Sequence, residues 1–260
     1  RDDGTLICCC YTPENDTAAW SEFTTSGRII DICGGYNSVT DEDELWCLVT
    51  YDGGLTRWIE KMPYPSRSKQ IRVTSDDDAL VDQNIVCMDG WISGTIIEGD
   101  NNIIQGLEQF EGLTVTAMVD DAYSGEYVVN DGTIVLEAPD PGDVPAYEGT
   151  YAVGFKYDGY GKTFEVVNGN PNGVGFGTFR KWTELNTRVL DSALPKINGQ
   201  LPRDRTQSTE MSVAEIIREG TQDLEVINLG YGSGSIEILQ DRPYPTHVLG
   251  FFGKIEVENS

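Results

Sequence analysis

Short apolar or alternating runs recur between turn signals along the whole sequence, and this pattern constrains the fold more than any other feature. Near the N-terminus such runs cover residues 5–11, 18–24, 28–32, 45–51 and 55–62. Each run has about the length of a β-strand, and the 3.6-residue periodicity of helices is scarce. The sequence therefore predicts an all-β fold, built as β-propeller-like blades with an inserted small β-barrel or sandwich domain.

Turn residues separate these runs. Asp52-Gly53 is the strongest hairpin signal, and Asn130-Asp131-Gly132 and Asp158-Gly159 predict two further turns. One short helix is possible at residues 212–218, where Ser212 could cap the first turn and Glu215 could complete a capping box. Residues 247–257 predict a strand close to the C-terminus.

A polar, proline-bearing stretch at residues 63–82 predicts a boundary between structural units. We expect residues 1–70 to form propeller-like blade strands and residues 71–175 to form the inserted β domain. Residues 176–260 then return to core strands, with a long polar loop at residues 202–220.

The charge balance is strongly acidic. Eighteen Lys and Arg residues stand against 43 Asp and Glu residues, which gives a formal net charge of −25. Such a chain repels nucleic acid, so tight binding to a phosphate backbone is excluded, although DNA could pass an acidic surface without adhering to it. Solubility alone is the simpler explanation of the same charge.

Six cysteines occur, three of them adjacent at Cys8, Cys9 and Cys10, with Cys33, Cys47 and Cys87 further on. Neighbouring residues of a strand point to opposite faces, which suits neither a disulfide framework nor a zinc site. We expect all six to be reduced, buried, small apolar residues, with disulfides and metal as the less favoured alternatives.

The sequence carries no recognisable catalytic motif, and we expect no enzyme activity and no cofactor. His247 is the single histidine and is expected to be structural or exposed. The abundant acids offer no metal-site spacing, so calcium is unsupported. The tryptophans, which lie in or beside the expected strands, are interpreted as blade core rather than as sugar-binding platforms. They are Trp20, Trp46, Trp58, Trp91 and Trp182.

Several segments, taken in order, resemble one protein family. They are RDDGTL at 1–6 with TAAWSEFTTSGR at 17–28, ELWCLV at 44–49 with TRWIEKM at 56–62, GL at 106–107, GLTV at 112–115 and NDGTIVL at 130–136. QDRPYPT at 240–246 and GFFGKIEV at 250–257 close the series. Together they resemble the C-terminal portion of the tail nozzle proteins, or tail tubular protein B, of short-tailed double-stranded DNA bacteriophages.

The resemblance implies a virion structural protein, assembled in the host cytoplasm. It would form a homo-oligomeric ring, with six copies expected, that docks to the tail adaptor protein and to tail fibres. The genome would leave through the ring without tight binding. Family members are much longer, so we expect sequence before Arg1 to be missing, and residues 202–220 would be a local insertion.

Two groups of charged residues are the candidate channel-facing or partner-facing positions, and a solvated loop is the alternative for each. They are Asp76, Asp77 and Asp78, and Arg203, Asp204 and Arg205. No position is expected to be catalytic or to bind a metal, and no apolar run is long enough to span a membrane. A carbohydrate-binding or receptor-binding β module is the first alternative function, and a propeller glycosidase with paired carboxylates is the second.

Overall fold

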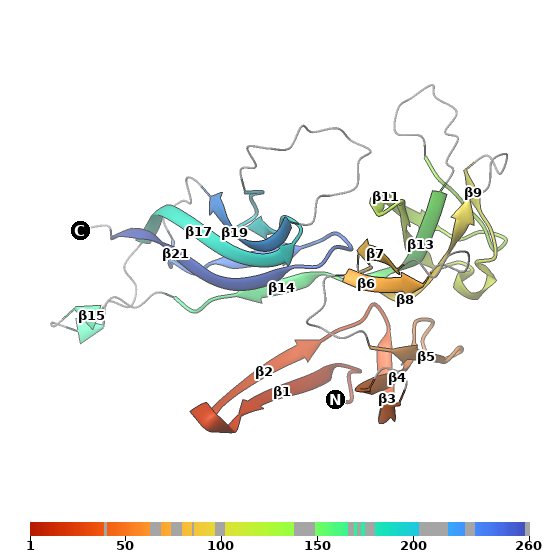
Figure 1. Cartoon of the computed structure of the whole chain (residues 1–260), viewed down its shortest axis with the longest axis horizontal. Coiled ribbons are helices and arrows are strands. Elements are labelled where there is room, and N and C mark those ends of the chain that lie inside the picture. Colours follow the sequence, from red (N-terminus) through yellow and green to blue (C-terminus); the bar gives the residue numbers. More distant parts are fainter. Residues whose placement is uncertain are drawn as a thin grey trace.

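In the computed structural model in Figure 1 the regular secondary structure is almost entirely antiparallel β-sheet, which confirms the all-β class. It describes residues 1–38, 41–62, 69–73, 80–84, 86–96, 102–137, 149–165, 169–170, 173–174, 180–202, 218–226 and 232–257. None of the sheets in these ranges closes on itself, so the propeller-like blades and the inserted barrel or sandwich remain predictions.

The first seven strands form three small sheets, ordered β1-β2, β3-β4-β5 and β6-β7. Their bounds are β1 Leu6–Thr12, β2 Thr17–Phe23, β3 Arg28–Asn37, β4 Glu42–Thr50, β5 Trp58–Lys61, β6 Lys69–Val73 and β7 Leu80–Asn84. The short 3₁₀ helix η1, Pro13–Asn15, forms the tip of the first hairpin. The polar stretch expected as a boundary thus contains the β6-β7 hairpin.

The central strands include a four-stranded sheet, β11-β10-β13-β8, and two separate two-residue pairings. They are β8 Met88–Ile96, β9 Ile103–Ile104, β10 Thr114–Val119, β11 Ala122–Val128, β12 Ile134–Val135, β13 Gly149–Lys156, β14 Gly159–Lys162, β15 Gly169–Asn170 and β16 Gly173–Val174, with the 3₁₀ helix η2 at Glu108–Phe110. β9 pairs with β12 and β15 with β16.

The last strands form a long, curved three-stranded sheet, β19-β17-β21, and the sheet β14-β20-β18. Their bounds are β17 Arg180–Ser192, β18 Lys196–Ile197, β19 Arg218–Val226, β20 Glu237–Gln240 and β21 His247–Val257. The bounds of β21 agree with the strand expected at residues 247–257. Arg218 opens β19, and the rest of the helix expected at residues 212–218 lies outside the described residues.

The turn predictions have different outcomes. Asp131 and Gly132 both adopt positive φ, and Asn130 and Thr133 exchange two backbone hydrogen bonds of 3.0 Å, so this tight turn is confirmed. Asp52-Gly53 does lie in a hairpin, between β4 and β5, although its loop is longer than two residues. Asp158-Gly159 does not form a hairpin, because β14 pairs with the distant β20 rather than with β13.

The largest core belongs to the central sheet and includes Phe110, Val153 and Phe155. Two side chains from the N-terminal strands also pack against it. Tyr51 stacks on Phe155 with ring centroids 4.1 Å apart, and Trp58 stacks on Phe110 at 5.6 Å. Side-chain packing therefore crosses the boundary expected at residue 70, and the limits of the domains remain predictions.

A smaller cluster links the central sheet to the C-terminal strands through Met118 and Tyr244. The Tyr244 hydroxyl donates to the carbonyl of Asp121 at 3.0 Å and accepts from the backbone N–H of Tyr123 at 2.9 Å. This buried phenol therefore fixes the segment before β21 to the central sheet.

Candidate assembly surface

The β1-β2 hairpin, called here the N-terminal arm, is a two-stranded sheet that no other element covers among the described residues. Figure 1 shows it as a long pair of strands beside the β3-β4-β5 sheet. Every strand residue of the arm is exposed or half-buried. Trp20 is 72% exposed, Tyr11 59% and Ile7 42%. An isolated two-stranded hairpin is only marginally stable in water, so such apolar exposure points to a contact with another molecule.

The strand register divides the arm into two different faces. Cys9 lies opposite Trp20 and Cys10 lies opposite Ala19, and residues two apart share a face. The aromatic face of the arm therefore carries Ile7, Cys9, Tyr11, Ala18, Trp20 and Glu22. The small-residue face of the arm carries Cys8, Cys10, Thr12, Thr17, Ala19 and Ser21. Leu6 and Phe23 share the latter face at the base of the arm, where both are half-buried.

The strands of the arm carry few charges, although two acids, Glu14 and Asp16, lie in the turn that joins them. Glu22 is the single charged side chain in its two seven-residue strands. Elsewhere the chain is rich in acids, with a net charge of −25. The acids of the arm lie at its tip and near its base, so the middle of both faces carries no charged side chain.

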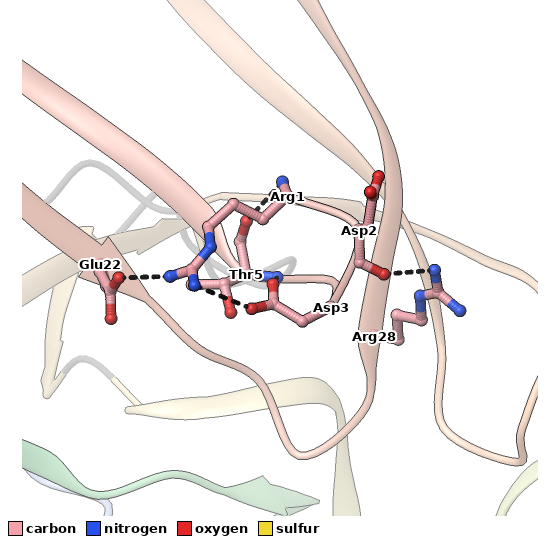
Figure 2. Close-up of polar contacts among 6 residues, drawn as sticks. All are labelled: Arg1, Asp2, Asp3, Thr5, Glu22 and Arg28. Carbon is pink, nitrogen blue, oxygen red and sulfur yellow. Dashed lines mark hydrogen bonds and ion pairs between the residues drawn. The ribbon is translucent and has the colours of Figure 1, made fainter.

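The base of the arm is fixed by a compact polar network, which Figure 2 shows. The Arg1 guanidinium contacts Glu22 at 2.7 Å and Asp3 at 3.4 Å. Arg28, at the start of β3, donates to the carbonyl of Asp2 at 2.6 Å. These contacts tie the first residues to both β2 and β3, although each exposed ion pair contributes at most about 1 kcal/mol.

Asp3 and Gly4 shape the turn that leads into β1. The Asp3 carboxylate accepts from the backbone N–H of Thr5 at 3.0 Å, and this bond, with the nearby Arg1 charge, lowers the pKa of Asp3. Gly4 has a φ of +87°, and a Cβ there would lie 2.2 Å from Cγ of Arg28. Only glycine fits without rearrangement, so the local sequence fixes where the arm leaves the body.

A pocket of about 570 Å³ lies beside this base, lined by residues that include Arg1, Arg28, Tyr51 and Gly54. Its two guanidinium groups already bind Glu22 and the carbonyl of Asp2. Arg1 is thus already paired with the carboxylates of Glu22 and Asp3, and the acid Asp2 also lines the pocket, so the exposed arm is the stronger candidate site.

A second exposed apolar surface lies on the outer face of the β3-β4-β5 sheet. Ile59 is 76% exposed, and Trp46, which shares its face, is 39% exposed. On the same face Lys61 forms an ion pair with Glu44 at 2.7 Å. This surface is therefore more polar than the arm.

Two half-buried acids, Glu60 and Asp89, lie where the β3-β4-β5 sheet meets β8. Burial raises the pKa of Glu60, and the hydroxyl of Tyr51 donates to both of its oxygens at 2.8 and 2.9 Å. Burial also raises the pKa of Asp89 to about 6, and the charge of Glu60 acts in the same direction. Oδ2 of Asp89 is buried and has no hydrogen-bond partner among the described residues.

The six charged residues predicted to face a channel or a partner all lie outside the described residues. They are Asp76, Asp77, Asp78, Arg203, Asp204 and Arg205.

The single histidine, His247, is half-buried at the start of β21, with Nδ1 3.2 Å from the carbonyl oxygen of Leu190. No group of three or more metal-binding side chains occurs within the described ranges. Nor do those ranges contain a helix long and apolar enough to cross a membrane.

The expectation of buried cysteines is wrong for four of the six. Cys8, Cys9, Cys10 and Cys33 are exposed, whereas Cys47 is buried and Cys87 is half-buried, and none of the six is in a disulfide bond. For Cys8, Cys9 and Cys10 the reason is that the arm has no second layer on either face, so its apolar run is not a core strand. Cys33 lies in β3 opposite Trp46, on the outer face of the β3-β4-β5 sheet.

The interpretation of the tryptophans as core is wrong for Trp20, Trp46 and Trp91, which are all exposed. Trp58 and Trp182 are partly buried and pack against core clusters, as expected. The interpretation of apolar residues as core therefore does not predict this candidate surface. The available signal was a pair of strands with apolar residues on consecutive positions and only one charge.

Comparison of the sequence with protein-family models and with curated proteins finds no match.

Proposed function

We propose that the chain is a structural subunit of the tail nozzle of a short-tailed double-stranded DNA bacteriophage, which assembles with its own copies into a ring. The observation that carries the proposal is the N-terminal arm, whose large apolar side chains lie in water on a chain that is otherwise strongly acidic. The ordered set of segments that resembles nozzle proteins supports it from the sequence.

In this proposal the sheets belong to β-propeller-like blades with an inserted small barrel or sandwich domain. The ring would dock to the tail adaptor protein and to tail fibres. Its acidic surface would let DNA leave under packaging pressure without being held, because like charges repel. The chain would act without catalytic residues or cofactors.

A carbohydrate-binding or receptor-binding module is the second candidate, since Trp20 and Tyr11 are exposed on the same face. Sugar platforms combine an aromatic ring with nearby polar groups that bind hydroxyls. On the arm the neighbours of Trp20 are Ile7, Cys9 and Ala18, and the only acid on that face, Glu22, already binds Arg1. This chemistry favours a protein partner over a glycan.

The molar mass in solution tests the proposal, measured by light scattering from about 1 μM to about 100 μM of the 260-residue chain. We expect a closed assembly that stops growing at a fixed multiple of the 28.7 kDa chain mass, with sixfold as the expected number. A strict monomer at all these protein concentrations, together with retention on a glycan array, would favour the binding module instead.

A further inference from the structure

We propose that the arm is the contact between neighbouring copies, and that the aromatic face of one arm stacks on the small-residue face of the arm of the next copy. This inference rests on the proposed function and specifies which surface holds the ring together and in which mode. The partner is a second copy of this chain.

The exposed apolar side chains of the arm favour face-to-face stacking over pairing of strand edges. Its apolar side chains project from both faces, and pairing along a free edge of β1 or β2 would leave Trp20 and Tyr11 exposed. Stacked sheets lie about 10 Å apart and remove such side chains from water. Burial of apolar area is the dominant favourable term in association, so stacking is the preferred arrangement.

The two faces have complementary shapes. On the aromatic face Tyr11 and Trp20 project from adjacent strands. On the small-residue face the exposed positions carry only cysteine, threonine, alanine and serine side chains, which leave a flat, low surface. An aromatic ring can lie on such a surface at close range, and the Cys8 and Cys10 sulfur atoms can contact it favourably. Two aromatic faces, or two small-residue faces, would fit each other less well.

Stacking of unlike faces has a consequence for symmetry. Each copy uses one patch for the neighbour on one side and a different patch for the neighbour on the other. Such heterologous contacts generate rings when the rotation closes, whereas a contact between like faces stops at a two-fold dimer. The arm therefore has the property that a ring subunit requires.

The area of the arm suits a reversible contact. Seven residues at a rise of about 3.4 Å give strands roughly 24 Å long, with the two strands about 5 Å apart. One stacked contact would remove on the order of 1,000 Å² from water, which is near the lower limit for a specific interface. Trp and Tyr supply most of the energy in such interfaces, so single substitutions on the arm should have large effects.

The test uses two variants that each block one face. W20K places a charge on the aromatic face and A19K places one on the small-residue face, at positions that are both exposed in the structure. We expect each variant alone to self-associate at least about tenfold more weakly than the unmodified chain. L55K is the matched control, because Leu55 is 91% exposed in the β4-β5 loop and lies outside the arm.

An equimolar mixture of the two variants gives the decisive result. The intact small-residue face of W20K can accept the intact aromatic face of A19K, so we expect a pair of twice the chain mass that grows no further. If W20K and L55K assemble as well as the unmodified chain, the stacking inference is overturned while the proposed ring remains. If A19K alone still assembles, the contact is between like faces and the inference also fails. A monomeric unmodified chain would reject ring formation itself.

Discussion

At the scale of single residues, the half-buried carboxyl of Asp89 is a group whose charge is costly in the folded protein. It lies near the start of β8, where burial and the Glu60 charge raise its pKa to about 6, and its Oδ2 atom has no partner in the described ranges. The folded protein therefore binds a proton at this carboxyl more tightly than the unfolded chain, whose pKa is near 3.8. Stability contributed by the protonated form is present below the unfolded value and is lost as the pH rises through the folded value.

We expect D89N to increase the free energy of unfolding above about pH 6 by on the order of 1–3 kcal/mol, because the amide carries no charge to desolvate. The advantage should shrink as the pH falls toward 4 and disappear below about pH 3, where Asp89 is protonated in both states. Urea unfolding at several pH values measures both effects. Equal loss of stability at pH 4 and pH 8 would contradict the interpretation.

Asp52 is a control for Asp89, because its pKa is shifted in the opposite direction. Its carboxylate accepts hydrogen bonds from Thr50 and from the backbone of Gly54 and Thr56, and bonds to Thr56 are the main cause of its lowered pKa. Stability from this carboxylate is present above the unfolded pKa and is lost as the pH falls through the folded one. D52N should therefore lower the midpoint of thermal unfolding at pH 7 more than it does at low pH.

At the scale of elements, the turn from Asn130 to Thr133 is the clearest case of local sequence deciding local structure. Asp131 and Gly132 have φ values of 52° and 66°, as a tight hairpin turn of this type needs. The backbone N–H of Gly132 also donates to Glu111 at 2.8 Å. Asparagine, aspartate and glycine tolerate this conformation best, so the turn could be predicted without the structure.

We expect G132A to lower the free energy of unfolding by about 1–2 kcal/mol, because alanine resists positive φ. Its Cβ would also lie 2.9 Å from Cγ of Glu108. G161A is the matched control, since Gly161 lies in β14 with no atom within 4 Å of its Cβ position. Denaturant unfolding compares the two variants, and an equal effect of both would show that the turn conformation is unimportant.

Which strands pair could not be predicted from the local sequence. Asp158-Gly159 has the composition of a hairpin turn, yet β14 pairs with β20, about eighty residues further on. Likewise, the β3-β4-β5 sheet contributes Tyr51 and Trp58 to the core of the central sheet. Both outcomes depend on side-chain packing between segments distant in sequence, which no turn signal encodes.

At the scale of the whole molecule, the net charge of −25 opposes self-association. The repulsion between copies is screened by salt, with a Debye length of about 10 Å at 0.1 M and about 3 Å at 1 M. The contact proposed for the arm is apolar and gains nothing from ion pairs between copies. Salt should therefore strengthen assembly rather than weaken it.

Raising the NaCl concentration from about 50 mM to about 500 mM should tighten self-association several-fold, as measured by sedimentation or light scattering. W20K in the same series is the control, because it lacks the apolar contact and should respond weakly. Dissociation of the unmodified assembly by salt would mean that ion pairs, rather than the arm, hold the copies together.

The sequence by itself determined the all-β class, the confirmed turn at Asn130-Asp131-Gly132 and the strong negative charge, because alternation, turn chemistry and charge are local or additive properties. Only the tertiary structure decided which apolar residues are covered. Val153 and Trp20 both lie in strands, but Val153 is fully buried in the central core whereas Trp20 projects from an arm with no second layer. Burial is a property of what packs above a strand, and that is set by distant parts of the chain.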